Sequence, residues 1–110
     1  MTGGGGRRWA CVALALAGVL LLPAMAAAET ITVQVAKLTF VPASVTAKVG
    51  DTIEWVNDDF VAHTATAADK SFDVSLAPGK TGSVVVKRAG EIAYSCRFHP
   101  MMKGTIEVTE

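Results

Sequence analysis

Near the end of this chain, a thiol, an imidazole and a thioether fall within seven residues. They belong to Cys96, His99 and Met102, which follow one another in the spacing CxxHxxM. Soft sulfur combined with imidazole nitrogen is a donor set that suits copper. A strand end followed by a short, constrained loop can turn all three donors toward one point. The segment therefore predicts most of a copper site.

A trigonal copper site with a long axial thioether needs a second imidazole. The chain contains two histidines, and the other one is His63, which lies 33 positions before Cys96. That separation is no obstacle, because loops from distant strands gather at one end of a β-sandwich. The candidate metal ligands are the following: His63, Cys96, His99 and Met102.

Each of these residues also has an ordinary explanation when it is taken alone. Cys96 could be an inert thiol of the core, and Met102 could fill a gap in it. His99 could be a surface histidine. Jointly, however, both histidines, the only cysteine after residue 28 and a methionine fall where one metal site needs them. The combination favours a metal site.

The N-terminal region has the pattern of an export signal. The apolar stretch of residues 9–22 follows Arg7 and Arg8, and a positive start before a short apolar run is typical of a signal peptide. The stretch is also short for a membrane span, which needs about 20 residues. An ordinary Sec signal is favoured, although the paired arginines leave twin-arginine export open.

Small residues at Ala26 and Ala28 predict cleavage after Ala28. The chain then divides into a signal peptide at 1–28 and a copper-binding domain at 29–110. We expect this domain to be periplasmic or otherwise secreted, without a membrane span. It keeps all ten acidic residues and eight of the ten basic ones, so its net charge is −2. That mild acidity argues against nucleic-acid binding, which needs a clustered basic face.

Exported domains normally pair their cysteines, yet the predicted mature domain keeps only Cys96. A single thiol in an oxidising compartment is explained by burial, by a metal or by chemical use. The side chains of Ile92, Tyr94 and Cys96 share one face of a predicted strand by the period of two. The thiol should therefore point inward, at one end of the domain.

Short runs rich in Val, Ile and Thr, separated by Gly, Pro and Asp turns, predict an all-β sandwich or barrel. We expect Trp55 to lie in the core. The segment 58–69 has poor periodicity and is expected to be a loop that carries His63. The expected strands are as follows: 31–35, 45–49, 52–57, 82–87, 91–96 and 105–109.

The chain resembles the cupredoxins and, in the length of its CxxHxxM loop, the amicyanin group of bacterial blue copper proteins. The resemblance rests on FVPASVTAKVGDTIEWVNDD followed by His63, and on GEIAYSCRFHPMMKGTIEV. It implies an all-β, cupredoxin-like Greek-key β-sandwich that holds one type 1 copper ion. The implied ligands are His63, Cys96, His99 and Met102. Met101 matches a loop residue that forms an apolar surface beside the second histidine.

The resemblance also implies a function, which is to carry single electrons between redox proteins by Cu(I)/Cu(II) cycling. Partners of this kind include a dehydrogenase and a c-type cytochrome, and the domain is expected to be a monomer and not an enzyme. An alternative is a periplasmic copper carrier or storage protein, whose donor types overlap with those of an electron carrier. An enzyme with Cys96 as the nucleophile and a histidine as its base is disfavoured, because no residue that would orient the histidine is recognisable.

The chain departs from the family pattern at three positions. Thr64 stands where many cupredoxins have an asparagine whose side chain links the two ligand loops. The backbone amide can still make its bond there, and the side-chain link is left open by the sequence. Arg97 and Phe98 replace a small residue and a proline, which can alter the partner that docks.

Overall fold

The computed structural model describes residues 27–110 of the chain. The predicted signal peptide therefore lies outside the described residues, apart from its last two positions. The described part contains nine strands and no helix. It accordingly contains no helix long and apolar enough to cross a membrane.

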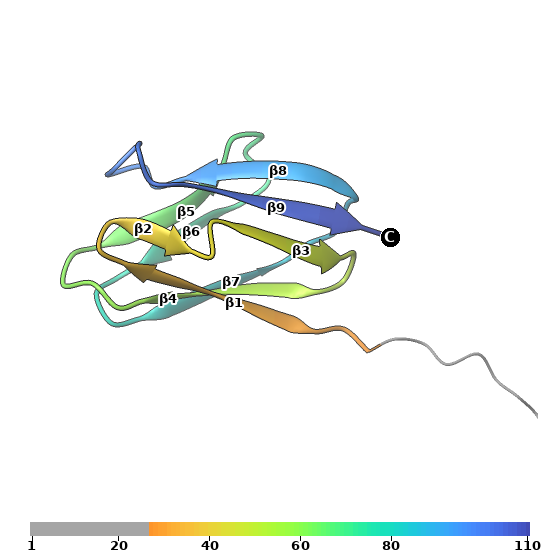
Figure 1. The fold of residues 1–110 in the computed structure, drawn as a ribbon, viewed down its shortest axis with the longest axis horizontal. Helices are drawn as coiled ribbons and strands as arrows, with labels where there is room; N and C mark the ends of the chain where they lie inside the picture. The colour runs from red at the N-terminus through yellow and green to blue at the C-terminus, as the bar shows by residue number, and fades with distance from the viewer. Residues whose placement is uncertain (1–26) are drawn as a thin grey trace, which may run out of the picture.

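The strands form two sheets, one of four strands in the order β2-β1-β4-β7 and one of five in the order β3-β9-β8-β5-β6. Two pairs, β1 with β4 and β3 with β9, are parallel, and the other pairs are antiparallel. The two sheets face each other (Figure 1), which confirms the predicted all-β sandwich. The bounds are: β1 Thr30–Ala36, β2 Thr39–Val41, β3 Ser44–Lys48, β4 Thr52–Asn57, β5 His63–Ala67, β6 Asp73–Leu76, β7 Thr81–Val85, β8 Gly90–Ser95 and β9 Lys103–Thr109.

The core lies between the sheets, where alternate residues of each strand point inward. In β4 the inward residues are Ile53, Trp55 and Asn57, and all three are buried. The Trp55 ring packs near the rings of Phe72 and Tyr94, with centroids 5.5 and 5.4 Å away. The prediction that Trp55 belongs to the core is confirmed.

The segment 58–69 was expected to be a loop, and this expectation is wrong for part of it. Residues His63–Ala67 form β5, which pairs with β6 on one side and β8 on the other. Four of its five residues are buried, so both of its faces are covered near the copper-ligand candidates. A strand covered on both faces has no polar and apolar alternation, and its sequence, HTATA, gives no period-two signal.

The connections that carry the predicted ligands meet at one end of the sandwich. The β4–β5 connection and the β8–β9 connection lie together at the end away from the C-terminus (Figure 1). His63 is the first residue of β5, and Cys96 directly follows the last residue of β8. The fold therefore brings the two distant parts of the sequence together.

Candidate metal centre

The segment from Cys96 to Met102 is a closed loop between two antiparallel strands. The amide of Cys96 donates to the carbonyl of Met102 at 3.1 Å, and the amide of Met102 donates to the carbonyl of His99 at 2.8 Å. These bonds hold the loop ends together where Ser95 and Lys103 form the last pair of the β8–β9 ladder. The short, constrained loop after a strand end, expected from the sequence, is confirmed.

Three of the four predicted ligands gather their donor atoms in one place. The Cys96 Sγ atom lies 3.7 Å from Nδ1 of His63 and 3.7 Å from Nδ1 of His99. One ligand atom from each of the three residues lies within 4.8 Å of the others. Met102, the fourth candidate, is buried in the core at the end of the same loop. One thiolate, two imidazoles and a thioether suit copper.

The four side chains differ in their access to solvent. Cys96 and His63 are almost fully buried, with exposed fractions of 0% and 1%, and Met102 is also buried. His99 is only partly buried, since it lies in the middle of the loop. Three of the four candidate ligands are therefore enclosed by protein, and the site approaches the surface at His99.

The His63 ring is oriented by a carboxylate that the sequence analysis did not single out. Asp59 Oδ2 lies 2.7 Å from Nε2 of His63. An ionised carboxylate can only accept, so Nε2 carries the proton and the lone pair of Nδ1 is free on the side that faces Cys96. This is the tautomer that a metal ligand needs.

Asp59 also joins His63 to the turn between β1 and β2. The amides of Lys37 and Leu38 donate to its two oxygens at 2.8 and 3.3 Å. Both turn residues have a positive backbone φ, 53° and 60°, which residues other than glycine rarely adopt. The hydrogen bond from the Lys37 amide has the largest effect on the pKa of Asp59, and the bond with His63 adds to it. Together they hold this pKa below its usual range. The carboxylate therefore stays ionised and fixes both the turn and the ring.

The Cys96 thiol lies in surroundings that favour its thiolate form. Burial has the largest single effect and would raise its pKa, but the Thr64 amide, the His63 and His99 rings and the Phe98 amide together outweigh it. They lower the pKa of Cys96 from 9.0 to about 6. A thiol that ionises this readily is prepared for metal binding, because the thiolate is the ligand form.

Thr64 links the two ligand-bearing segments through both its backbone and its side chain. Its amide donates to Cys96 Sγ at 3.4 Å, and its Oγ1 accepts the amide of Arg97 at 2.9 Å. The question that the sequence left open is thus answered, since the threonine hydroxyl provides a side-chain link where many cupredoxins have asparagine.

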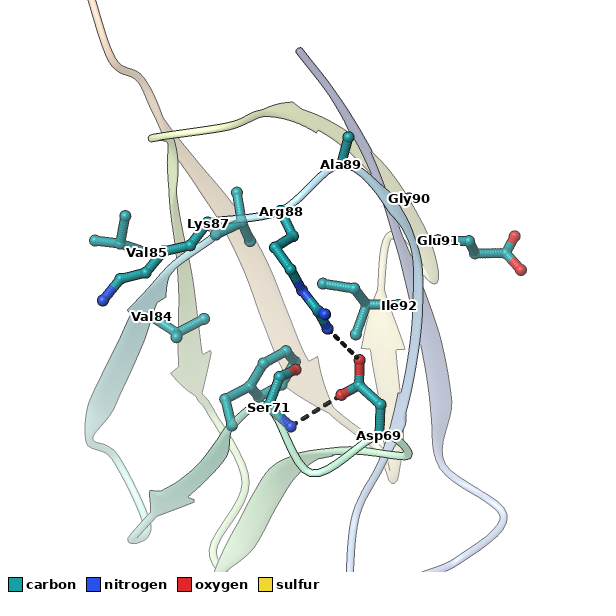
Figure 2. A pocket seen from close by; sticks show the side chains of 12 residues that line it. Asp69, Ser71, Val84, Val85, Lys87, Arg88, Ala89, Gly90, Glu91 and Ile92 are labelled. Atoms are coloured by element: carbon teal, nitrogen blue, oxygen red, sulfur yellow. Dashed lines mark hydrogen bonds and ion pairs between the residues drawn. The ribbon is translucent and has the colours of Figure 1, made fainter.

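A hollow lies elsewhere, at the start of the strand whose other end leads to Cys96. It has a volume of about 340 Å³, and Phe72, Val84 and Ile92 belong to its lining. Figure 2 shows Arg88 reaching toward Asp69, with 3.7 Å between nitrogen and oxygen. No histidine, cysteine or methionine lines this hollow, so its residues do not provide the donors of a copper site.

The geometry agrees with comparisons to known proteins. The chain matches the family model of a cupredoxin-like domain over residues 10–108. It is similar to plastocyanin from Scenedesmus fuscus, with 39% identity over 85 residues that cover 64% of this chain and 87% of that protein.

Solved structures are similar as well. A reduced amicyanin mutant superimposes with a TM-score of 0.64 and 27% identity, covering 72% of this chain and 81% of the other. A purple cupredoxin from Nitrosopumilus maritimus gives a TM-score of 0.67 over 72% of this chain and 99% of the other. Its sequence identity is 24%, so this likeness shows the fold alone. The predicted resemblance is therefore confirmed.

Proposed function

This chain belongs to the cupredoxin family and has copper as its cofactor, and we propose that it carries single electrons between redox proteins outside the cytoplasm. We assign the copper ligands as His63, Cys96, His99 and Met102. When bound, copper supplies one-electron cycling between Cu(I) and Cu(II). The protein contributes a fixed set of donors in an enclosed site.

The observation that carries the proposal is the arrangement of the donors. The Cys96 sulfur lies 3.7 Å from each imidazole Nδ1. His63 is held in the ligand tautomer by Asp59, and the Thr64 amide points at the sulfur. Donors that are fixed in advance keep the geometric change between the two oxidation states small, and a small change makes electron transfer fast.

The electron is proposed to leave and enter through His99. This ring is partly exposed, and apolar side chains are exposed on the two connections at its end of the sandwich: Phe60, Val61, Phe98 and Met101. Phe60 and Met101 are 98% and 93% exposed. An exposed apolar patch is typical of an interaction site, and transient docking of a redox protein suits it. A dehydrogenase and a c-type cytochrome are the proposed kinds of partner.

The burial of the donors favours electron transfer over the two rivals. A copper carrier must hand over its ion, but here two of the three clustered donors are fully enclosed and only His99 approaches the solvent. An enzyme with a Cys96 nucleophile must admit a substrate to the sulfur, which is 0% exposed. Both functions would need a more open thiol.

Cellular location forms part of the same proposal. We infer that residues 1–28 direct export and are removed, and that residues 29–110 act in the periplasm as a monomer. The patterns that support this are the arginine pair, the apolar stretch at 9–22 and the small residues before Glu29. Mass spectrometry of the protein purified from a periplasmic fraction would test both the export and the cleavage site.

The decisive experiment is reconstitution of residues 29–110 with Cu(II), followed by visible and EPR spectroscopy and voltammetry. We expect an intense blue band, a narrow copper hyperfine splitting and reversible one-electron cycling. Cys96→Ser should remove the blue band and leave the β-sheet circular dichroism of the copper-free protein unchanged. A colourless copper complex that yields its ion to a chelator would instead support a carrier.

A further inference from the structure

A closed ring of hydrogen bonds lies beside the proposed copper ligands. The amide of Arg97 donates to Thr64 Oγ1 at 2.9 Å, and Thr64 Oγ1 lies 2.9 Å from Thr66 Oγ1. The Thr66 hydroxyl donates to Asp73 Oδ1 at 2.8 Å. The same carboxylate oxygen accepts Nε of Arg97 at 3.2 Å, which closes the ring.

Asp73 fixes the direction of the two bonds in the ring that threonine hydroxyls donate. Because its carboxylate only accepts, the Thr66 hydroxyl must donate to it, and the Thr66 oxygen is then free to accept the Thr64 hydroxyl. The Thr64 oxygen can in turn accept the Arg97 amide. Hydrogen bonds that run in one direction strengthen one another. The side chains of Arg97 and Asp73 are 49% and 53% exposed, so solvent screens the charge at this end of the ring.

The ring lies where the backbone ladder is missing between the two ligand-bearing strands. The ladder between β5 and β8 consists of two pairs, Thr66 with Ser95 and Ala67 with Tyr94. It therefore ends before Thr64, and the copper end of β5 is joined to the loop after β8 by side chains. Thr64 follows the ligand His63, and Arg97 follows the ligand Cys96. The ring thus determines how far apart the two ligand-bearing segments lie.

We propose that Asp73 is a positioning residue for the copper centre. Through Thr66 and through Arg97 it holds the Thr64 amide against Cys96 Sγ. A hydrogen bond to the sulfur stabilises negative charge on the thiolate and therefore stabilises the more negative, reduced site. Loosening the ring should weaken this bond and lower the reduction potential. The inference rests on the proposed function only for the measurements made on the copper-loaded protein.

The experiment compares Asp73→Ala with Asp73→Asn. Both variants lose the charge, but only asparagine keeps an acceptor oxygen for Thr66 and Arg97, so their difference isolates the hydrogen bonds from the charge. Asp69→Ala is the matched control. Asp69 lies in the turn between β5 and β6, pairs with an arginine and accepts the amide of Ser71, without a bond to either ligand-bearing segment.

In the copper-free protein, we expect amide exchange at Thr64 and Arg97 to be faster in Asp73→Ala than in Asp73→Asn. With copper, we expect Asp73→Ala to have the lower reduction potential and a changed EPR hyperfine splitting. Its Cu(II) affinity should fall by about 10-fold, as it does when partners around metal ligands are removed. Asp69→Ala should match the parent protein in all of these measurements.

Equal amide exchange and equal potentials in the alanine and asparagine variants would overturn the inference, as would the same changes in Asp69→Ala. If Asp73→Ala does not fold, Thr66→Val breaks the same ring with a side chain of similar shape and takes its place in the comparison. Faster exchange in the copper-free variant, together with no blue copper in the parent protein, would refute the proposed function while upholding the positioning role.

Discussion

The carboxylate of Asp59 and the ring of His63 form a hydrogen bond of 2.7 Å on the side of the imidazole that faces away from Cys96. His63 is buried, and Asp59 is the hydrogen-bond partner of its Nε2 atom. The bond fixes both the proton and the orientation of the ring. It therefore makes the histidine ready to bind metal.

Replacing Asp59 with alanine should weaken copper binding. The ring loses its acceptor at Nε2 and the β1–β2 turn loses the partner of two amides, so we expect Cu(II) affinity to fall by about 10- to 100-fold. Titration against a competing chelator measures the change. Asp58→Ala is the control, because Asp58 is the exposed neighbour. Equal losses in the two variants would show that Asp59 does not orient the ligand.

The two adjacent methionines should differ sharply when each is changed to leucine. Met102 is 3% exposed and Met101 is 93% exposed, so only Met102 can reach the enclosed site. Leucine is similar in size to methionine but has no donor. We expect Met102→Leu to shift the reduction potential and the blue band, and Met101→Leu to leave both unchanged. Similar shifts in both variants would contradict Met102 as the axial ligand.

Acid should destabilise the copper-free protein partly through Asp51. The backbone nitrogens of Glu29 and Lys48 donate to this carboxylate at 2.9 and 2.8 Å, and they lower its pKa in the folded state. The unfolded chain then binds the proton more readily, so the stabilisation is present above about pH 4 and is lost as the pH falls through the folded pKa. Urea unfolding between pH 7 and pH 3 measures this loss.

Asp51→Asn is the matched variant for that measurement, since it cannot ionise. We expect it to be less stable than the parent protein at pH 7 and to lose less stability on acidification. Asp51 lies in the turn before β4, at the end of that strand away from the metal site. The blue band of the copper-loaded variant at pH 7 should therefore be unchanged. Parallel stability curves for the two proteins would show that Asp51 does not contribute to the acid response.

A methyl group added at Gly104 should destabilise the sandwich. Gly104 is paired with Tyr94 across β8 and β9, and a Cβ atom there would overlap the Tyr94 ring. Overpacking of a core costs about 1–3 kcal/mol, which is the loss expected for Gly104→Ala. Lys103→Ala, at the exposed position before it, should change stability by less than about 0.5 kcal/mol. Thermal unfolding of both copper-free variants distinguishes the two cases.

The ligand types and most of the strands could be predicted from the sequence, because both depend on residues that lie close together in the chain. The period of two places Tyr94 and Cys96 on one inward face, and both are buried. The spacing CxxHxxM places three donors in one short loop whose ends are bonded to each other. These relationships involve neighbours in the chain, so the sequence alone contains them.

The partners of the ligands were decided by the tertiary structure. β5 carries His63 but gives no alternating pattern, because four of its five residues are buried and both of its faces are covered. Asp59, Thr66, Asp73 and the Arg97 side chain belong to no recognisable motif. Each contributes through a bond to a residue on another strand or turn. Such bonds depend on the pairing of β1 with β4 and of β5 with β6 and β8, and only the folded sandwich creates these pairings.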